Sequence, residues 1–366
     1  MKRTRGLASE VRAALPGWVA ARVLVVAAWF ASRLWIEHRR NGVRPDASLF
    51  GLFAWDGTFY RGLAQHGYSF EATEALRFFP LYSLLGRLLD YVTQIGPGTA
   101  LLVIANVCAL LAGGLVYRLA RMESDRRTAQ RSALLFALVP SAFVLTFAYA
   151  EALFVLLAAL TFVGLRRERW WMAAIAGFLA GLTRPTGVFL ALAAAVEAGR
   201  GIRNRRVGEL PARAVAVLAP LAGAATYLWW VDREFGDWKL PLRLQTDLRG
   251  DVANPIIRVG QAASDLVHLD KHGLHFPFAI ALIVLTVVVF QRLPASYGMF
   301  SAAIVVTSLA SENLNSIERY GLNAFPLVIA LAMLVPSRTA ERVTVVVCGA
   351  GLFGLCALAW LGIYVP

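Results

Sequence analysis

Glu151 and Arg184 interrupt long apolar runs of this sequence, Arg319 stands at the edge of another, and Asp56 lies in the segment between the first two runs. A charge at bilayer depth costs roughly 2.5–3.5 kcal/mol on insertion scales, so an ionisable residue at such a place is a candidate for function. A carboxylate can act as a general base, and a guanidinium can bind phosphate oxygens bidentately. Each of the four also has a structural alternative, such as a helix cap, an ion pair or a solvated loop.

The first of these acids belongs to the sequence Trp55-Asp56-Gly57-Thr58-Phe59-Tyr60, which runs on to Gln65-His66-Gly67-Tyr68. On a helix, Asp56, Tyr60 and Leu63 share one face, so the spacing predicts an amphipathic helix in the membrane interface that ends at Gly67. Asp56 would stand in its first turn. From spacing alone a helix cap is favoured over catalysis, because Asp caps helices well and capping is the commoner role.

Aromatic residues follow in the sequence Arg77-Phe78-Phe79-Pro80-Leu81-Tyr82. Pro80 is predicted to open a helix in its first turn, where a missing backbone N–H does no harm. The aromatic side chains are typical of a membrane-interface belt, so this segment by itself indicates a position more than a chemistry.

Two charged motifs interrupt the longest apolar runs, namely Tyr149-Ala150-Glu151-Ala152 and Thr183-Arg184-Pro185-Thr186-Gly187. Glu151 and Arg184 could pair with each other or contact a ligand, and the sequence leaves both open. Pro185 and Gly187 should break the helix, and broken helices at membrane depth usually line a cavity.

The turn from Ser311 to Tyr320 is densely polar between two apolar runs. A solvated loop explains most of these residues. It does not explain Arg319 well, because this residue enters the next apolar run.

The segment 232–275 contains several acids and three histidines, His268, His272 and His275. Their spacings of four and three would suit a metal on one helix face, but Gly273 and Pro277 interrupt such a helix. An acceptor-binding loop or an extracytoplasmic lid is therefore favoured over a metal site.

The elements that must position these residues are membrane helices. Of 366 residues, 58% are hydrophobic and only 16% are charged, and the mean hydropathy is +0.60. A soluble domain has about 25% charged residues. Apolar runs of this length belong in lipid, where a helix satisfies its own backbone hydrogen bonds. The net charge of +13 lies in short loops and indicates orientation, not nucleic-acid binding.

The arginine clusters predict that orientation. Basic residues precede the first span at 18–36, flank the long apolar runs at 132–165 and 170–198, and follow the second of them through Arg205 and Arg206. All of these clusters can face the cytoplasm only if each long run is a hairpin of two short helices. The result is about 11 membrane segments in a plasma membrane, with a cytoplasmic N-terminus and an external C-terminus. Arg22 and Arg33, within the first span, could each extend to the nearer interface.

The predicted fold class is an all-α polytopic membrane protein with amphipathic interfacial helices in its first outer loop. Residues 1–366 are treated as one membrane domain, with outer loops at about 37–98 and 232–275. Cys108, Cys348 and Cys356 all fall in apolar runs without metal or disulfide spacing, so they are interpreted as small buried side chains.

Taken in order, the motifs resemble the PIG-V family, the second mannosyltransferases of GPI-anchor assembly and their bacterial relatives. The matching segments are Trp55-Asp56, Phe78-Phe79-Pro80-Leu81, Ala148-Tyr149-Ala150-Glu151, Thr183-Arg184-Pro185-Thr186-Gly187 and Arg319-Tyr320. Ala150 replaces the usual hydroxyl residue of the family, and Pro185 stands where Ser is frequent. These two departures concern the acceptor more than the fold.

The resemblance implies the GT-C glycosyltransferase architecture and a polyprenyl-phosphate-mannose donor. It implies that Asp56 is the catalytic base of an inverting transfer to an extracytoplasmic glycolipid, glycan or protein acceptor. The residues expected to bind the donor phosphate or sugar are Arg61, Arg77, Tyr149, Glu151, Arg184, Arg319 and Tyr320. Supporting positions are Trp55, Tyr60, His66, Phe79 and Pro80. No cofactor is expected, because arginines can hold a monophosphate leaving group without a metal.

The main alternative is a polytopic transporter or lipid-linked-sugar flippase. Such proteins also contain broken helices and buried charge, but they are built from internal repeats with polar residues near the midplane. No repeat is visible here, and the polar motifs are predicted on one membrane face. A non-catalytic scaffold subunit is a third possibility, and it would tolerate changes at Asp56 and Arg184.

Overall fold

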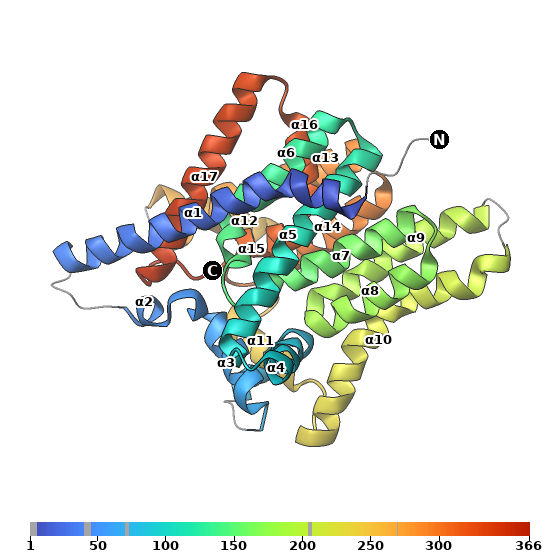
Figure 1. Ribbon diagram of the computed structural model, residues 1–366, viewed down its shortest axis with the longest axis horizontal. Coiled ribbons are helices and arrows are strands. Elements are labelled where there is room, and N and C mark those ends of the chain that lie inside the picture. The colour runs from blue at the N-terminus through green and yellow to red at the C-terminus, as the bar shows by residue number, and fades with distance from the viewer. Residues whose placement is uncertain (1–5, 40–44, 70–72, 204–206, 269) are drawn as a thin grey trace. The chain divides into compact units, whose positions relative to one another are not determined.

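The computed structural model describes residues 6–39, 45–69, 73–203, 207–268 and 270–366, and these are almost entirely helical (Figure 1). The only β pairing among them is the isolated bridge between Val252 and Ser311. The all-α prediction is confirmed. Five basic residues used in the orientation argument lie outside the described residues: Lys2, Arg3, Arg5, Arg205 and Arg206.

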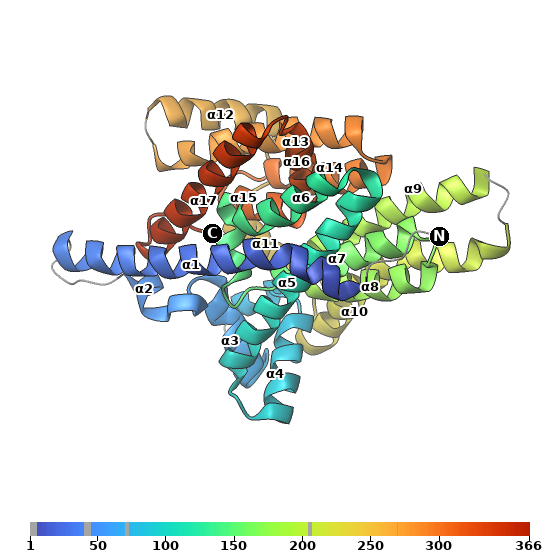
Figure 2. The same ribbon diagram turned by 45° about the horizontal axis from the view of Figure 1, so that its top comes forward.

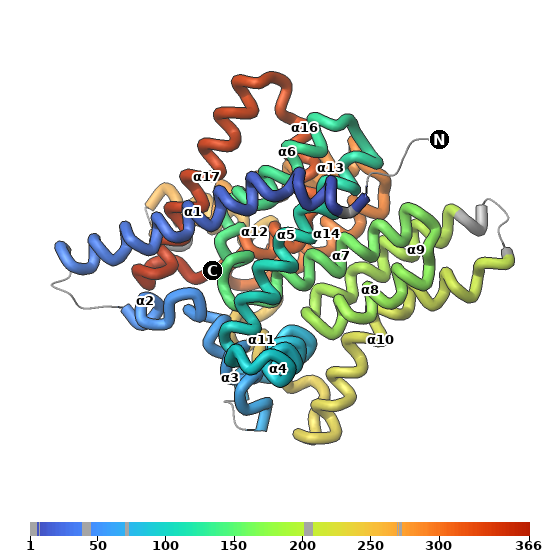
Figure 3. The backbone as a smooth tube through the Cα atoms, viewed as in Figure 1, coloured from blue at the N-terminus to red at the C-terminus, as the bar shows by residue number. Residues whose placement is uncertain are grey.

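The chain divides into two compact units, which are described separately. Unit 1 comprises Met1–Gln65, Ser83–Leu156 and Val328–Pro366, and unit 2 comprises His66–Tyr82 and Leu157–Leu327. Figures 2 and 3 allow each stretch to be followed by its colour along the chain. Each unit therefore combines segments that are distant in the sequence.

Unit 1 is organised around α1 (Leu7–Arg39), which contacts α5 (Pro97–Glu123), α6 (Arg126–Leu138) and α17 (Arg338–Trp360). Small residues permit this close packing, as is usual between membrane helices. At Gly17, for example, an added Cβ would lie 3.1 Å from the backbone of Leu134.

The first outer loop also contributes helices to unit 1. They are α2 (Asp46–Phe50), the 3₁₀ turn η1 (Gly51–Phe53), α3 (Asp56–His66) and most of α4 (Leu81–Thr93). Helix α3 has the predicted bounds, and the left-handed φ of +79° at Gly67 ends it. Pro80 lies one residue before α4, and not inside its first turn.

Unit 2 contains α8 (Trp170–Thr183), η4 (Pro185–Phe189), α9 (Leu190–Arg203), η5 (Val207–Glu209), α10 (Leu210–Phe235), α11 (Leu240–Arg249) and α12 (Pro255–Val267). Next come η6 (Lys271–His275), α13 (Phe276–Arg292), α14 (Ala295–Leu309) and α15 (Ile317–Asn323), and η2 (Thr73–Arg77) joins them from the first outer loop. Helices α8 and α10 pack at backbone distance, because Gly223 lies directly against the carbonyl of Phe178.

Five described helices are long and apolar enough to cross a membrane: Ala8–His38, Pro97–Glu123, Leu210–Phe235, Gly273–Arg292 and Arg338–Trp360. Trp170–Thr183 and Ala295–Leu309 are apolar but shorter. These helices agree with a multi-pass membrane protein. The count of 11 segments and the sidedness remain predictions.

Both long apolar runs are broken near the predicted positions. The run 132–165 is divided by η3 (Pro140–Leu145), after which α7 (Glu151–Arg166) begins. The run 170–198 is divided at Arg184. One break was not predicted: α15 and α16 (Pro326–Leu334) form a bent pair at 91° within the run 320–335. Pro326 accounts for it, because a residue before proline disfavours helical geometry.

Removal of the Arg131 side chain should destabilise the protein. This buried guanidinium donates to Glu341 at 2.8 Å and to the carbonyl of Val335 at 2.7 Å, and so joins α6 to the α16–α17 segment of unit 1. We expect Arg131→Ala to cost about 1–3 kcal/mol, less than a fully buried pair because Glu341 is 30% exposed. Thermal unfolding in detergent measures this loss.

Arg127→Ala is the matched control, because Arg127 donates to the same carboxylate at 3.1 Å but is 46% exposed. It should cost no more than about 1 kcal/mol. Equal losses of stability in the two variants would show that burial of Arg131 does not strengthen its contribution to stability.

Candidate active site

In unit 1, the start of α3 is bound to the segment before α7. The backbone N–H of Ala148 donates to the carbonyl of Leu52 at 3.0 Å, and the backbone N–H of Asp56 donates to the Tyr149 hydroxyl at 3.3 Å. Gly57 lies next to the same segment, because an added Cβ would be in van der Waals contact with the Ala148 carbonyl oxygen, at 3.6 Å. Two motifs that are about 90 residues apart in the sequence therefore meet at Asp56.

Trp55 fixes the backbone immediately before Asp56. It has a φ of +59°, in the left-handed region that a residue with a large side chain rarely adopts. Its indole N–H donates to the carbonyl of Ala359 at 3.1 Å, and its own carbonyl accepts from the Thr58 hydroxyl at 2.8 Å. Such strain costs about 1–3 kcal/mol and persists only where the surroundings enforce it, which is common at functional sites.

The two candidate site acids of unit 1, Asp56 and Glu151, have different surroundings. Asp56 is partly exposed at the first residue of α3, whereas Glu151 is fully buried at the first residue of α7. Both carboxylates thus lie at helix N-termini, where the helix dipole favours negative charge. Tyr149 is also fully buried. Only Asp56 of the three could meet a substrate without rearrangement.

A polar network inside unit 1 holds the segment that leads to Tyr149. Arg22 donates to the Asn106 side chain at 3.0 Å and to the carbonyl of Leu145 at 3.1 Å, and Asn106 donates to the carbonyl of Thr146 at 3.2 Å. The idea that Arg22 extends to the interface is therefore wrong. Its guanidinium binds the Leu145 carbonyl, which the end of η3 leaves outside regular helix.

The remaining candidates on α3 have unequal positions. The Arg61 guanidinium lies 5.0 Å from the centre of the Phe53 ring, one turn beyond Asp56. Tyr60 is buried, and its carbonyl accepts from Ser83 at 3.3 Å. His66 is exposed in the last turn. Tyr60 therefore packs the helix, whereas Arg61 is half-buried one residue further along α3.

In unit 2, three arginines surround Tyr320. The guanidinium carbons of Arg249, Arg184 and Arg319 lie 4.2 Å, 5.8 Å and 5.8 Å from the centre of the ring. Arg184 and Arg319 are buried, and Arg249 is half-buried. The structure thus brings together three predicted residues, Arg184, Arg319 and Tyr320. Arg249 was missed, because nothing in its local sequence distinguishes it from the other arginines of the 232–275 loop.

Local backbone geometry explains why these arginines lie outside regular helix or near its start. Arg184 is extended, with φ −154° and ψ 149°, since it precedes Pro185. Arg319 lies in the first turn of α15, just after Ser316, whose φ is +65°. Both arginines are therefore positioned by helix breaks.

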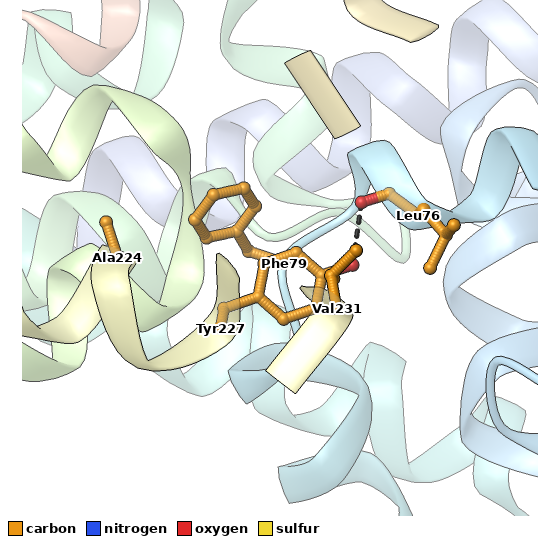
Figure 4. Close-up of a cluster of buried hydrophobic side chains, with 5 residues drawn as sticks. All are labelled: Leu76, Phe79, Ala224, Tyr227 and Val231. Carbon is orange, nitrogen blue, oxygen red and sulfur yellow. Dashed lines mark hydrogen bonds between the residues drawn. The ribbon is translucent and has the colours of Figure 1, made fainter. Parts of the chain in front are cut away.

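The Phe-Phe-Pro motif has a packing role in unit 2. Figure 4 shows Leu76, Phe79, Ala224, Tyr227 and Val231, which form a buried cluster. Phe79 and Tyr227 have ring centres 4.6 Å apart, and the Tyr227 hydroxyl donates to the carbonyl of Leu76 at 2.7 Å. Arg77 lies with its guanidinium 5.0 Å from the Phe78 ring. The motif attaches η2 to α10.

The two histidines of the 232–275 loop whose side chains are described, His268 and His275, have separate partners. His275 contacts Glu318 at 2.8 Å, and His268 contacts the backbone of Ser264. Within the described residues, no group of three or more His, Cys, Asp or Glu side chains could hold a metal ion.

Replacement of Tyr149 by Phe should loosen the start of α3. The substitution keeps the ring and removes the hydroxyl that accepts from the Asp56 N–H, and one such hydrogen bond is worth about 0.5–1.5 kcal/mol. Amide hydrogen exchange in the peptide that contains Asp56 should accelerate by up to about tenfold. Tyr91→Phe is the control, because Tyr91 is 78% exposed on α4. Unchanged exchange in the Tyr149 variant would mean that the hydroxyl does not hold this helix.

Residues 43–194 match the model of the mannosyltransferase (PIG-V) family. This stretch includes Asp56, Arg77, Glu151 and Arg184, whereas Arg249 and Arg319 lie beyond it. No curated protein matches the chain.

Two solved structures are among those similar to this chain. ArnT from Cupriavidus metallidurans, bound to undecaprenyl phosphate, gives a TM-score of 0.52 at 14% identity over 89% of this chain and 61% of ArnT. The archaeal oligosaccharyltransferase AglB from Archaeoglobus fulgidus, in complex with an inhibitory peptide and a dolichol-phosphate, gives 0.46 at 13% identity over 92% of this chain and 56% of AglB. The chain thus spans about three fifths of the length of ArnT.

The resemblance indicated by the sequence motifs is confirmed: the chain is a membrane protein with the GT-C glycosyltransferase fold, and its residues 43–194 match the PIG-V mannosyltransferase family.

Proposed function

We propose that this protein is an inverting glycosyltransferase that moves a mannosyl residue from polyprenyl-phosphate-mannose to a hydroxyl group outside the cytoplasm. The family match supports the sugar, and the fold shared with ArnT supports a membrane enzyme. The observation that carries the proposal is the held start of α3, where Trp55 and Tyr149 fix the backbone of the accessible acid Asp56.

Asp56 is proposed as the general base. It removes the proton from the acceptor hydroxyl while that oxygen attacks the anomeric carbon of the mannosyl group. The new bond joins the acceptor oxygen to this carbon. The bond between the carbon and the donor phosphate oxygen breaks, and its electron pair leaves with the phosphate. A single displacement of this kind inverts the anomeric configuration.

Arg184 and Arg319 are proposed to bind the donor phosphate. A guanidinium offers a planar fork of donors that matches phosphate oxygens, and it remains charged at every physiological pH. Arg61 and Arg77 are proposed as further contacts with the donor. Glu151 is proposed to orient an arginine or to bind a sugar hydroxyl.

A membrane-borne donor follows from the proposed location. Nucleotide sugars are absent outside the cytoplasm, so an enzyme that works there needs activated sugar on a lipid carrier. The bound undecaprenyl phosphate of ArnT supports a carrier of the same class here. A glycolipid, a glycan and a glycoprotein all provide suitable acceptor hydroxyls.

Replacement of Asp56 by Asn tests the base. The amide keeps the shape of the side chain and cannot accept the proton, so transfer should fall by about 10²- to 10⁴-fold. Purified protein in liposomes with radiolabelled polyprenyl-phosphate-mannose and a membrane extract as acceptor source gives the rate. Release of free polyprenyl phosphate distinguishes transfer from transport of the intact donor.

Asp46→Asn is the matched control, because Asp46 is an exposed acid at the start of α2 in the same outer loop. It should leave the rate unchanged. Full activity of Asp56→Asn would remove Asp56 from the base role, and movement of intact donor without sugar transfer would favour a flippase.

Replacement of Arg184 by Lys tests phosphate recognition. Lysine keeps the charge and loses the two parallel donors, so turnover should fall by about tenfold or more. The same liposome assay measures it, and Arg243→Lys on the exposed face of α11 serves as the control. Normal turnover with Lys at position 184 would argue against bidentate contact there.

A further inference from the structure

The 232–275 loop supplies Arg249 to the group of three arginines around Tyr320. This arginine lies outside the residues that match the family. Arg249 is the last residue of α11, and its guanidinium is the nearest of the three to the Tyr320 ring, at 4.2 Å. The charge of a guanidinium is attracted to the face of an aromatic ring. The centre of the Tyr320 ring thus lies within 5.8 Å of three guanidinium carbons.

Short contacts within unit 2 fix the position of Arg249. Its guanidinium donates to the carbonyl of Asn315 at 3.0 Å, and its own carbonyl accepts from the backbone N–H of Asn313 at 3.3 Å. Next to it, the backbone N–H of Asp251 donates to the carboxylate of Glu312 at 3.1 Å. The end of α11 is thus attached to the polar turn that leads into α15.

Gly250 makes this attachment possible. It has a φ of +77°, and an added Cβ would collide with the side chain of Glu312. The bridge between Val252 and Ser311 continues the same pairing. The loop therefore presents Arg249 beside Arg319 through backbone contacts.

The chemistry of the proposed donor indicates what the positive charge of Arg249 could contribute to the reaction. A mannosyl phosphodiester carries one negative charge, whereas the released phosphomonoester carries nearly two above its second pKa of about 6. An interaction that strengthens as charge develops lowers the barrier, while one that binds both states equally does not. Three guanidiniums favour the state with more charge.

We propose that Arg249 is a phosphate-binding residue and that the Arg184, Arg249 and Arg319 cluster selects a lipid phosphomonoester dianion over the corresponding diester. This inference rests on the proposed function, since it concerns the leaving group of that transfer. It also makes the released lipid phosphate a tight-binding product inhibitor. The loop that follows α10 then belongs to the donor-phosphate site and not only to an acceptor lid.

Direct binding tests the proposal without turnover. The probes are farnesyl phosphate, its methyl diester farnesyl methyl phosphate, and uncharged farnesol, each added at pH 8 to the full-length protein in nanodiscs. Wild-type protein should bind farnesyl phosphate at least about tenfold more tightly than the methyl diester. Arg249→Gln should weaken the binding of farnesyl phosphate by about 10- to 100-fold and weaken the binding of the diester less. The affinity for farnesol should not change.

The matched control is Arg243→Gln, on the same helix, where the arginine is 62% exposed and pairs with Asp237. It should bind all three probes as the wild type does. The affinity of Arg249→Lys for farnesyl phosphate should lie between those of wild type and Arg249→Gln, because lysine keeps the positive charge but lacks the two parallel N–H donors of arginine. Inorganic phosphate should displace farnesyl phosphate only at much higher concentration, and equal potency would overturn the assignment to a lipid phosphate.

Two further results would contradict the proposal. One is equal affinity of Arg249→Gln and wild type for farnesyl phosphate, and the other is an equal loss of farnesol binding, which would indicate a structural role. Either result can occur in a protein that still transfers mannose through Asp56, so failure here is separable from failure of the proposed function.

Discussion

The constraint on which this structure depends is the satisfaction of backbone polar groups where membrane helices break. No water in the bilayer core can bind an open carbonyl or N–H, so such groups must find partners in the protein. Arg22 and Asn106 supply them for Leu145 and Thr146, and the Tyr149 hydroxyl supplies one for the N–H of Asp56. The groups that satisfy a broken backbone thereby fix the candidate catalytic acid.

The breaks themselves could be predicted from the sequence, because their causes are local. Pro185 and Gly67 mark helix ends that the structure confirms, because a residue before proline avoids helical geometry and Gly67 adopts a left-handed φ. The side-chain spacing around Asp56 likewise gives the bounds of α3. Five short motifs indicated the family and its fold, and four of them lie within the residues that match the PIG-V family.

Contacts between distant segments could not be predicted in the same way. No feature of the sequence around Arg22 indicates that its partner is Asn106, 84 residues away. Its position near a helix end suggested the membrane interface, whereas the structure places it against internal polar groups. Arg249 looks like any loop arginine until Gly250 allows the chain to pair with the 311–316 turn. The bend between α15 and α16 was missed because an apolar run conceals a break when only Pro326 signals it.

The same constraint explains why charge is effective at these places. A buried guanidinium has lost most of its competing water, so its attraction for an anion is stronger than at an exposed surface. Arg184 and Arg319 are buried beside an aromatic ring, and the backbone around them is fixed by Pro185 and by the left-handed Ser316. Donors that are already oriented need little reorganisation when negative charge develops. Broken helices therefore do two things in this fold: they expose backbone that the protein must satisfy, and they hold Arg184 and Arg319 at fixed positions, as the proposed recognition of a lipid phosphate requires.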